Sequence, residues 1–382
     1  VPNNATMGTP SNNVPVLNIA KPSDAGVSVN KFKDFNVGQE GLIVNNLNLQ
    51  DYNFNYKSEL SGGHVEFNPN FRDGDYAKVI LNEVVSNSKT AMNGFTEIYG
   101  HPADYIVANP NGITCAGCGF INTTRLALIT GSSNIKNGDI ESFTISPNAV
   151  LRIDGQGVGN LGLYSPSSAD LVSNAIKISG DIAVYGDLKV LSGNDKYDWN
   201  LQTISSKGET SPEVAIDVYS LGGMKAGNIT VIATQKGFGV NLDGDVVADA
   251  GNIEITSEGE IKLKNIVAQN DIVADSKGNL STINNGKIIA NDFVLLNSGK
   301  DISLFGDKIL SNEIVLMSGN NFTNNSIINS DNDLYIEAKG NFENKSQISA
   351  VNDFELLSGK NLTNSNGLLI SGNDLFISSN QS

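Results

Sequence analysis

Two cysteines and two histidines are the residues of this 382-residue chain with the most obvious capacity for chemistry. Cys115 and Cys118 stand together in the segment TCAGCGF, and the histidines are His64 and His101. A zinc site would have to complete its ligand set from those histidines and from carboxylates. A thioredoxin-like CxxC motif opens a helix, whereas the flanking residues here are glycine-rich and typical of strands. We expect a structural disulfide in an oxidising compartment, with reduced thiols as the alternative.

The acidic residues form no recognisable catalytic or metal-binding pattern. Asp73-Gly74-Asp75 could suggest calcium, but the nonapeptide repeat and the EF-hand loop are absent from the sequence. Aspartates recur at equivalent positions of a repeat: Asp271, Asp292, Asp333, Asp353 and Asp374. Such copies indicate a turn function, because catalytic groups are usually unique. No nucleophile–base pair is visible, and Arg125 is expected to form an ion pair at the surface. The sequence therefore predicts no enzyme activity, no metal and no cofactor.

Charge and hydropathy exclude several classes of partner. The net charge is −16, whereas a nucleic acid requires a basic surface and so does an anionic membrane. No apolar run approaches the roughly 18–20 residues that span a bilayer. The chain starts at Val1-Pro2 without a charged and then apolar leader. We expect that a signal peptide has been removed.

A repeat of about 20 residues in the last third of the chain indicates the fold. Asparagine, usually followed by aspartate and an apolar residue, recurs at Asn270, Asn291, Asn312, Asn332, Asn352 and Asn373, in steps of 21, 21, 20, 20 and 21 residues. Glycine recurs at Gly278, Gly299, Gly319, Gly340 and Gly359, in steps of 21, 20, 21 and 19 residues. Two independent markers with one period are typical of a solenoid.

The repeat predicts an all-β fold, a right-handed parallel β-helix with about 20 residues per coil. A leucine-rich repeat has a similar length, but its leucine frame is absent and no segment has the pattern of a helix. Asparagine at the turns is explained by its tolerance of left-handed backbone geometry and by its side-chain hydrogen bonds, which could stack into ladders. We expect the first 50 or so residues to form an N-terminal β cap, with small β elements outside the helix. The C-terminal end looks cut in mid-repeat.

Two segments share an Asn-Pro-Asn core. They are Phe67 to Phe71 (FNPNF) and Ala108 to Ile113 (ANPNGI). Proline fixes φ and biases the preceding asparagine towards an extended conformation, while the second asparagine and the glycine accept turn geometry. Each segment therefore predicts a tight turn, which by itself carries no function.

The sequence around the second turn, ANPNGITCAGCGFINTTRLALITG, closely resembles the signature of the two-partner secretion domain. Such a domain begins filamentous haemagglutinins, secreted haemolysins and contact-dependent growth inhibition exoproteins (CdiA). Three stretches agree with it in order: GVSVNKFKDFNVGQEGLIVNN from Gly26, NPNF from Asn68, and KVILNEVVS from Lys78. The resemblance covers roughly residues 14–235, and Phe71 for the usual leucine is a conservative departure.

The resemblance implies that the chain is a secretion domain. It would cross the inner membrane by the general secretory route, bind the POTRA domains of its cognate outer-membrane transporter in the periplasm, and fold outside the cell of a Gram-negative bacterium. Carried onto this chain, the transporter-recognition motif is Asn109, Pro110, Asn111, Gly112 and Ile113, with Asn68, Pro69 and Asn70 as a secondary motif. A purely structural role as β-turns is the alternative for both motifs.

The same resemblance divides the chain into a secretion domain over residues 1–235 and haemagglutinin-type β-helical repeats over residues 236–382. The parent protein is expected to be a growth-inhibition toxin, and a haemolysin or a filamentous adhesin is the alternative. A carbohydrate- or receptor-binding adhesin acting through this segment, or a β-helical polysaccharide-active enzyme, are the competing functions. We expect a monomer, with any cell-surface receptor bound by regions beyond this fragment.

Overall fold

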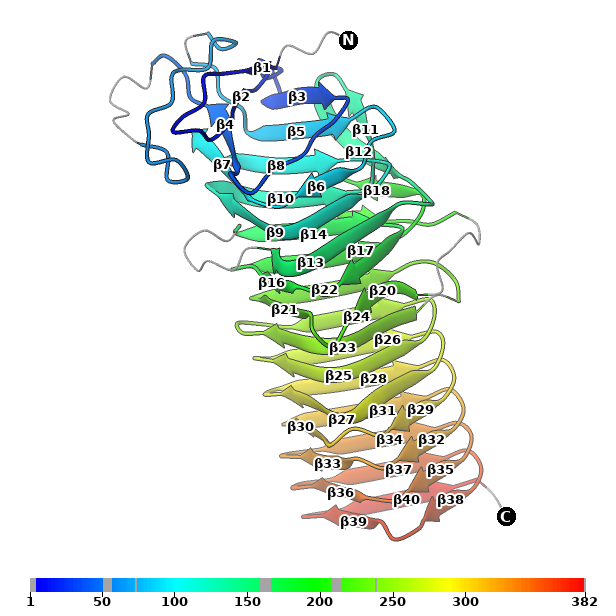
Figure 1. Cartoon of the computed structure of the whole chain (residues 1–382). Coiled ribbons are helices and arrows are strands. Elements are labelled where there is room, and N and C mark those ends of the chain that lie inside the picture. The colour runs from blue at the N-terminus through cyan, green and yellow to red at the C-terminus, as the bar shows by residue number, and fades with distance from the viewer. Residues whose placement is uncertain are drawn as a thin grey trace. The chain divides into compact units, whose positions relative to one another are not determined.

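In the computed structural model of the chain, the described residues are 5–50, 57–72, 74–158, 166–207, 214–237 and 239–380. These residues form strands, turns and bends, and none of them lies in a helix, so no helix among them could cross a membrane. The chain divides into two compact units, Val1–Thr210 (unit 1) and Ser211–Ser382 (unit 2). Parallel strands stack into coils in each unit (Figure 1). The prediction of an all-β parallel β-helix is confirmed.

Unit 2 is a regular stack of coils. Its strands are β20 (Val214–Val218), β21 (Gly223–Ala226), β22 (Asn228–Ala233), β23 (Gly239–Ala248), β24 (Ile253–Ser257), β25 (Ile261–Ala268), β26 (Asp271–Ser276), β27 (Leu280–Ala290), β28 (Phe293–Ser298), β29 (Ile302–Leu304), β30 (Lys308–Ser311), β31 (Glu313–Ser318), β32 (Phe322–Asn324), β33 (Ile327–Ser330), β34 (Leu334–Ala338), β35 (Phe342–Asn344), β36 (Gln347–Ala350), β37 (Phe354–Ser358), β38 (Leu362–Asn364), β39 (Leu368–Ser371) and β40 (Leu375–Ser379). Each later coil holds three strands, as in β28–β29–β30, and each strand pairs in parallel with its counterpart in the next coil.

The core of unit 2 is a ladder of apolar side chains in register. Alternate residues of each strand point inward, as the alternating burial of β28 and β31 shows. The inward column Ile272, Val294, Ile314, Leu334 and Phe354 is at most 2% exposed. Phe322 and Phe342 stack in consecutive coils with ring centroids 5.4 Å apart. Burying such a side chain stabilises the fold by about 1.5–3 kcal/mol. Each coil of the repeat therefore contributes to stability through its own apolar residues.

Asparagine ladders join the turns of unit 2. The amide nitrogen Nδ2 of Asn324 donates to Oδ1 of Asn344 at 2.9 Å, and Nδ2 of Asn344 donates to Oδ1 of Asn364 at 2.8 Å. In the repeated Asn-Asp step, Nδ2 of Asn352 donates to Oδ1 of Asp333 in the preceding coil at 2.9 Å. The expectation of left-handed geometry is wrong, because none of the six repeat asparagines is among the described residues with positive φ. Asn332, Asn352 and Asn373 instead use their side chains for hydrogen bonds to the preceding coil.

The repeat glycines have a different cause, which is close approach between coils. A Cβ on Gly319 would lie 2.3 Å from the carbonyl oxygen of Gly299, and one on Gly359 would lie 2.1 Å from that of Lys339. Three of these glycines, Gly299, Gly319 and Gly359, directly follow a serine whose hydroxyl forms a further ladder of hydrogen bonds between coils. Oγ of Ser318, for example, donates to the carbonyl of Lys300 at 2.8 Å. Equivalent donors are Ser276, Ser298 and Ser358. Their position one or two residues before the glycine marker was the signal in the sequence.

Unit 1 is a less regular stack. Its strands are β1 (Thr6–Met7), β2 (Val16–Asn18), β3 (Val27–Phe32), β4 (Leu42–Asn46), β5 (Val79–Val84), β6 (Thr90–Met92), β7 (Phe95–Gly100), β8 (Ala103–Ala108), β9 (Ile113–Ile121), β10 (Thr123–Ile129), β11 (Gly131–Lys136), β12 (Asp139–Ile145), β13 (Val150–Val158), β14 (Ser168–Ser173), β15 (Ala175–Ile178), β16 (Asp181–Ala183), β17 (Asp187–Ser192), β18 (Lys196–Asp198) and β19 (Thr203–Ile204). Strands β3, β5, β8, β10, β14 and β17 form one parallel ladder.

Two features of unit 1 stand outside its coils. Strand β1 pairs antiparallel with β2. Strand β2 also pairs in parallel with β4, and this is the first parallel pairing along the chain. Parallel pairing between coils therefore begins at Val16, within the first 50 or so residues that were expected to form the cap. Strands β11, β12, β18 and β19 form an antiparallel sheet, here called the extra-helical sheet. It contacts the ladder at β5 and β10, where the N–H of Ser133 donates to Oε1 of Glu83 and the guanidinium of Arg125 donates to the hydroxyl of Tyr197, both at 2.8 Å. Leu81, Ile106 and Ala127 in this ladder are fully buried.

Candidate functional site

The first candidate residue, Asn109, directly follows β8 and is completely buried. Its Nδ2 donates to the carbonyl of Ser88 and to Oγ1 of Thr90, both at 2.9 Å. Its Oδ1 accepts from the backbone N–H of Asn111 at 2.9 Å, which closes the turn. Its own N–H donates to the carbonyl of Ile129 at 2.9 Å. One side chain thus ties the turn to the segment that precedes β6.

The remaining residues of this motif divide into a buried and a partly exposed set. Nδ2 of Asn111 donates to the carbonyls of Ser86 and Ser88 at 2.8 and 3.3 Å. Gly112 has φ of +118°, and a Cβ there would lie 3.1 Å from the carbonyl of Val150. Ile113 is 1% exposed, whereas Pro110 and Asn111 are half-buried. The folded turn therefore presents only Pro110 and Asn111 to the solvent.

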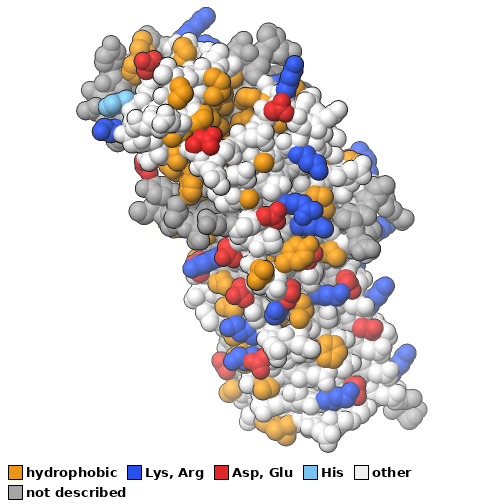
Figure 2. All heavy atoms as spheres, in the orientation of Figure 1, with side chains coloured by type: hydrophobic (Ala, Val, Ile, Leu, Met, Phe, Trp, Pro, Cys, Tyr) orange, Lys and Arg blue, Asp and Glu red, His pale blue; other side chains and the backbone are white. Residues whose placement is uncertain are grey.

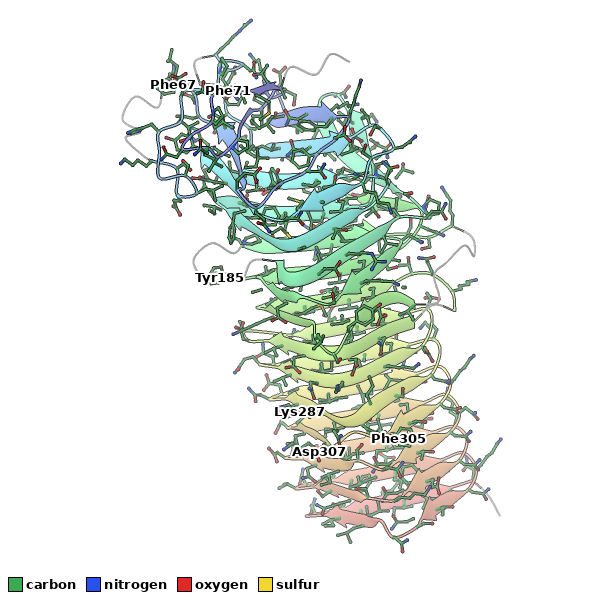
Figure 3. The ribbon with its side chains drawn as sticks, in the orientation of Figure 1. Phe67, Phe71, Tyr185, Lys287, Phe305 and Asp307 are labelled. Carbon is green, nitrogen blue, oxygen red and sulfur yellow. A yellow bond between two sulfur atoms is a disulfide. The ribbon has the colours of Figure 1, made fainter. Side chains whose placement is uncertain are left out.

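The secondary motif uses the same device in another coil. Nδ2 of Asn68 donates to the carbonyls of Ile19 and Asn45 at 3.0 and 2.9 Å, and its Oδ1 accepts from the N–H of Asn70 at 2.9 Å. Nδ2 of Asn70 donates again to the carbonyl of Ile19, at 3.1 Å. Asn68 is 3% exposed and Pro69 is exposed. Phe67 and Phe71 flank this motif and are both labelled in Figure 3.

The hydrogen-bonding partners of these asparagines could not be identified from the two motifs alone. Ser88 and Thr90 lie 21 and 19 residues before Asn109, one coil away. The only signal in the sequence was that both residues lie about one repeat period before Asn109, because residues one period apart are neighbours in consecutive coils.

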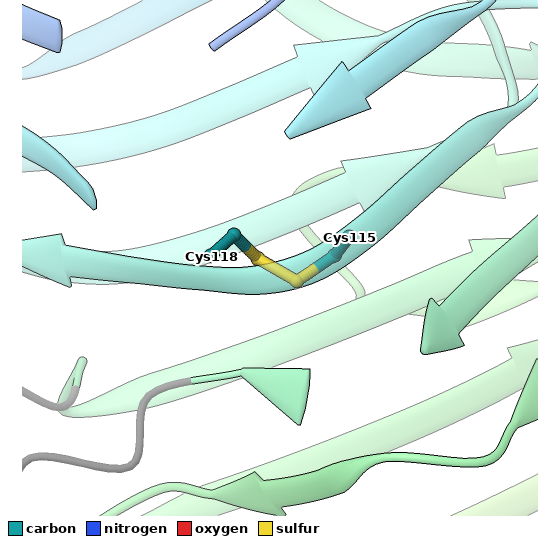
Figure 4. The surroundings of a disulfide bond; sticks show 2 residues. All are labelled: Cys115 and Cys118. Carbon is teal, nitrogen blue, oxygen red and sulfur yellow. A yellow bond between two sulfur atoms is a disulfide. The ribbon is translucent and has the colours of Figure 1, made fainter. Parts of the chain in front are cut away.

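The disulfide between Cys115 and Cys118 lies within the single strand β9 (Figure 4). The Cα atoms are 5.4 Å apart, and both cysteines are at most 1% exposed. Residues three apart in a regular strand face opposite sides, but Gly117 adopts φ of +84° and the register with β13 shifts at this point. The bulge turns both side chains towards the interior. Burial keeps this bond away from solvent and from thiol exchange.

Arg125 is buried, not at the surface as expected. Its side chain is 13% exposed, and its Nε donates to Oδ2 of Asp170 at 2.9 Å. Its guanidinium also donates to the hydroxyl of Tyr197 at 2.8 Å and lies 3.8 Å from the ring centroid of Trp199. Tyr197 donates in turn to Asp170 at 2.8 Å. This cluster fastens the extra-helical sheet to β10 and β14, and its members lie too far apart in sequence for spacing to reveal it.

The other candidates for chemistry remain apart. His64 is exposed, while His101 stacks on Tyr76 with ring centroids 4.4 Å apart. Asp73 of the calcium candidate lies outside the described residues. Within the described part of the chain, no three His, Cys, Asp or Glu side chains are placed to hold a metal ion. Figure 2 shows Lys and Arg side chains interspersed with Asp and Glu on the visible face.

Residues 1–263 match the model of the TPS secretion domain family. The chain is 39% identical over 267 residues to the 16S rRNA endonuclease CdiA of Enterobacter cloacae, an alignment that covers 69% of this chain and 8% of that protein. It is 35% identical over 249 residues to a hemolysin of Proteus mirabilis, covering 64% of this chain and 15% of the hemolysin. The chain therefore spans less than a tenth of the CdiA relative's length.

A solved structure agrees with the fold. The crystal structure of a filamentous hemagglutinin secretion domain matches with a TM-score of 0.54 at 22% identity, over 99% of this chain and 98% of that one. Exoproteins with this domain are exported by outer-membrane transporters and are secreted or displayed on the cell surface. The family and the fold point to a non-enzymatic role for this segment. The chain belongs to the TPS secretion domain family, the export domain of two-partner secretion.

Proposed function

We propose that this chain is the part of a large exoprotein that the POTRA domains of a cognate outer-membrane transporter recognise. In this proposal a signal peptide directs the chain to the periplasm, the transporter binds it there, and it folds into its coils outside the cell. The family match supports the pairing with a transporter.

The burial of Asn109 is the observation that supports our proposal for how the transporter recognises this motif. Asn109 is 0% exposed and Ile113 is 1% exposed, so a folded domain offers little of this motif to a partner. We propose that the transporter binds Asn109, Pro110, Asn111, Gly112 and Ile113 while the chain is unfolded. After export the same residues would close the turn through the hydrogen bonds of Asn109. The secondary motif at Asn68, Pro69 and Asn70 would act in the same way.

A pair of matched variants separates recognition from folding. Asn109→Ala removes a buried amide that makes four hydrogen bonds: its Nδ2 donates to Ser88 and Thr90, and its Oδ1 accepts from the backbone N–H and from Nδ2 of Asn111. Asn344→Ala removes an equally buried amide in unit 2, which donates to Ser346 and Asn364 and accepts from Asn324 and Ser346. Each variant is secreted from cells that carry the transporter, and the exported and retained protein is quantified.

Recognition through the motif predicts at least tenfold less export of Asn109→Ala and nearly normal export of Asn344→Ala. Pro110→Ala, a half-buried position without a side-chain hydrogen bond, should also lose export while keeping its stability. Equal losses for Asn109→Ala and Asn344→Ala, with normal export of Pro110→Ala, would assign both asparagines to folding alone.

We further propose that the parent protein is a contact-dependent growth inhibition toxin. The higher identity to CdiA, 39% against 35% for the hemolysin, supports this choice. In this proposal residues 236–382 begin the haemagglutinin-type repeats, and the receptor-binding and toxic regions lie elsewhere in the parent. Co-culture of cells making the full-length parent with sensitive cells tests it. Contact-dependent loss of the sensitive cells is expected, whereas lysis of erythrocytes without growth inhibition would favour a haemolysin.

A further inference from the structure

Both sulfur atoms of the disulfide between Cys115 and Cys118 lie in the apolar interior of unit 1 (Figure 4). Cys115 is 0% exposed and Cys118 is 1% exposed. Cys115 pairs with Met92 of β6 in the preceding coil and with Ile153 of β13 in the following coil, and both of these residues are 0% exposed. In the folded chain the bond is therefore shielded on both sides along the stack.

This burial blocks the chemistry that forms or exchanges a disulfide. In that chemistry a cysteine thiolate attacks a sulfur atom of an existing disulfide, so both the thiolate and a path to the sulfur are required. An apolar environment disfavours the charged thiolate, and the buried position leaves no path for a second disulfide-bearing molecule. A chain that folded with two free thiols would therefore keep them until the coil around β9 opened.

The residues between the two cysteines allow the bond to close without the rest of the fold. The cysteines are separated only by Ala116 and Gly117, so their encounter requires no contact with another part of the chain. Gly117 has φ of +84° in the closed loop, and glycine adopts positive φ about as readily as negative φ. The loop is thus able to form in an unfolded chain.

The closed loop also matches a bend that β9 requires. Strand β9 pairs with β6 as far as Met92 opposite Cys115, and it pairs with β7 from Phe95 opposite Gly119 onwards. The register between β9 and β13 shifts across the same residues. The disulfide therefore spans the corner where β9 passes from one strand of the preceding coil to the next. A loop that is closed first presents β9 to its neighbours already bent.

We propose that Cys115 and Cys118 are oxidised while the chain is unfolded, before β9 pairs with its neighbours, by an oxidant that carries a reactive disulfide of its own. One cysteine thiolate attacks a sulfur atom of the oxidant, and the other sulfur atom of the oxidant leaves as a thiolate. The second cysteine thiolate then attacks the mixed disulfide and displaces the oxidant. The chain loses two protons and two electrons in total, which the oxidant gains as it becomes a dithiol.

The place of this step in the cell rests on the proposed function. Oxidation then belongs to the periplasm, after the chain crosses the inner membrane and before it folds outside the cell. The transporter receives a chain in which Cys115 and Cys118 are already joined. The order of oxidation before folding does not depend on the transporter, because it follows from the burial of both cysteines.

Oxidation rates of the purified chain in its folded and unfolded states test this order. The chain is reduced in urea, and one portion is refolded before oxidised glutathione is added to both portions. Alkylation and mass spectrometry then count the free thiols over time. We expect oxidation of the refolded portion to be at least about 100-fold slower, because it requires the coil to open. Similar rates would overturn the proposal, whereas a reduced chain that fails to refold would itself place oxidation before folding.

A surface pair with the same spacing is the matched control. Lys136→Cys and Asp139→Cys are introduced together into a chain that carries Cys115→Ser and Cys118→Ser. Lys136 and Asp139 are exposed, lie opposite each other in the hairpin of β11 and β12, and also enclose a glycine. This pair should oxidise at similar rates in the refolded and unfolded portions. Slow oxidation of the surface pair after refolding would show that the refolding conditions, and not burial, slow the reaction, which would also overturn the proposal.

Alkylation of the chain in cells distinguishes this inference from the proposed function. In cells without the transporter, we expect the chain retained in the periplasm to be sensitive to protease and already oxidised. Protease-sensitive periplasmic chain with free thiols, or folded chain in the medium with free thiols, would overturn the order. Export that does not depend on the transporter would contradict the proposed function and would not alter the rates measured on the purified chain.

Discussion

Buried asparagine side chains join consecutive coils at several turns of this protein. Each amide donates two hydrogen bonds and accepts up to two, so one residue can satisfy backbone groups on its own coil and on the next. Asn109 and Asn68 do this in the two Asn-Pro-Asn turns, and Asn324 and Asn344 do it in the repeats. Removing one such residue leaves buried partners unsatisfied, which costs more than the lost bond.

Asn109→Ala should therefore lower the free energy of unfolding of unit 1 by about 2–4 kcal/mol, because four hydrogen bonds of a completely buried amide are lost. Urea denaturation of the purified chain measures this loss. Asn134→Ala is the control, since its Nδ2 bonds to Ser142 and Thr144 are partly open to water. We expect less than about 1 kcal/mol there. Equal losses for the two variants would contradict the role assigned to Asn109.

Two buried tyrosines make the fold sensitive to alkali. Burial raises the pKa of Tyr105, and burial with the nearby charge of Asp170 raises the pKa of Tyr197. Below pH 10 both hydroxyls are protonated in the folded and unfolded states. Above pH 10 only the unfolded chain loses these protons, so stability falls as the pH rises, by up to about 1.4 kcal/mol per pH unit for each tyrosine.

Urea denaturation at pH 8, 10 and 11 checks this dependence. The stability should fall little between pH 8 and 10 and more steeply between pH 10 and 11. Tyr197→Phe and Tyr105→Phe should each reduce the slope. Tyr105→Phe should cost little at pH 8, because the Tyr105 hydroxyl makes no well-formed hydrogen bond. An unchanged slope in both variants would show that other groups control the alkaline transition.

At the scale of one strand, β9 combines a bulge with the disulfide. The bond closes a very short loop, so the entropy that it removes from the unfolded chain is small. Reduction should lower the free energy of unfolding by about 2 kcal/mol or less and leave the coil intact. Denaturation and refolding with and without dithiothreitol compares the two states. A reduced protein that fails to fold would contradict a merely supportive role for the bond.

The extra-helical sheet depends on the buried cluster around Arg125. Arg125→Met would leave Asp170 as an unpaired charge that is 4% exposed in its side chain, at a cost of about 3–5 kcal/mol. Trp199 is the single tryptophan of the chain and lies against Arg125, so its fluorescence reports on this contact. We expect a red shift in Arg125→Met and none in Arg152→Met, which alters an exposed arginine on β13. No shift in either variant would mean that the sheet is held by other contacts.

The repetitive elements could be predicted from sequence because each coil meets the same constraint. A position that must bond to the next coil, or that must let it approach closely, is filled by the same residue every 20 or so positions. Gly319 and Gly359 show this for close approach. The expected left-handed geometry of the repeat asparagines was wrong, because a turn residue can be selected for its side chain while its backbone stays ordinary.

At the scale of the molecule, the two units place different demands on the sequence. Unit 2 repeats one solution, whereas unit 1 interrupts its coils with the extra-helical sheet and two Asn-Pro-Asn turns. The turns themselves were predictable from their residues. The partners of Arg125 were not, because Asp170 and Tyr197 lie 45 and 72 residues away and belong to an excursion without a period. The family signature located the candidate site, while its burial became visible only in the folded chain.

The most direct test of the account is export of this chain from cells with and without the cognate outer-membrane transporter. The 382-residue segment, preceded by a signal peptide, is expressed in both strains. The amount of this protein is then measured in the medium and in the periplasm. We predict folded protein in the medium only when the transporter is present, and accumulation in the periplasm when it is absent. Equal export from the two strains would contradict the assignment of this chain as a transporter-dependent secretion domain.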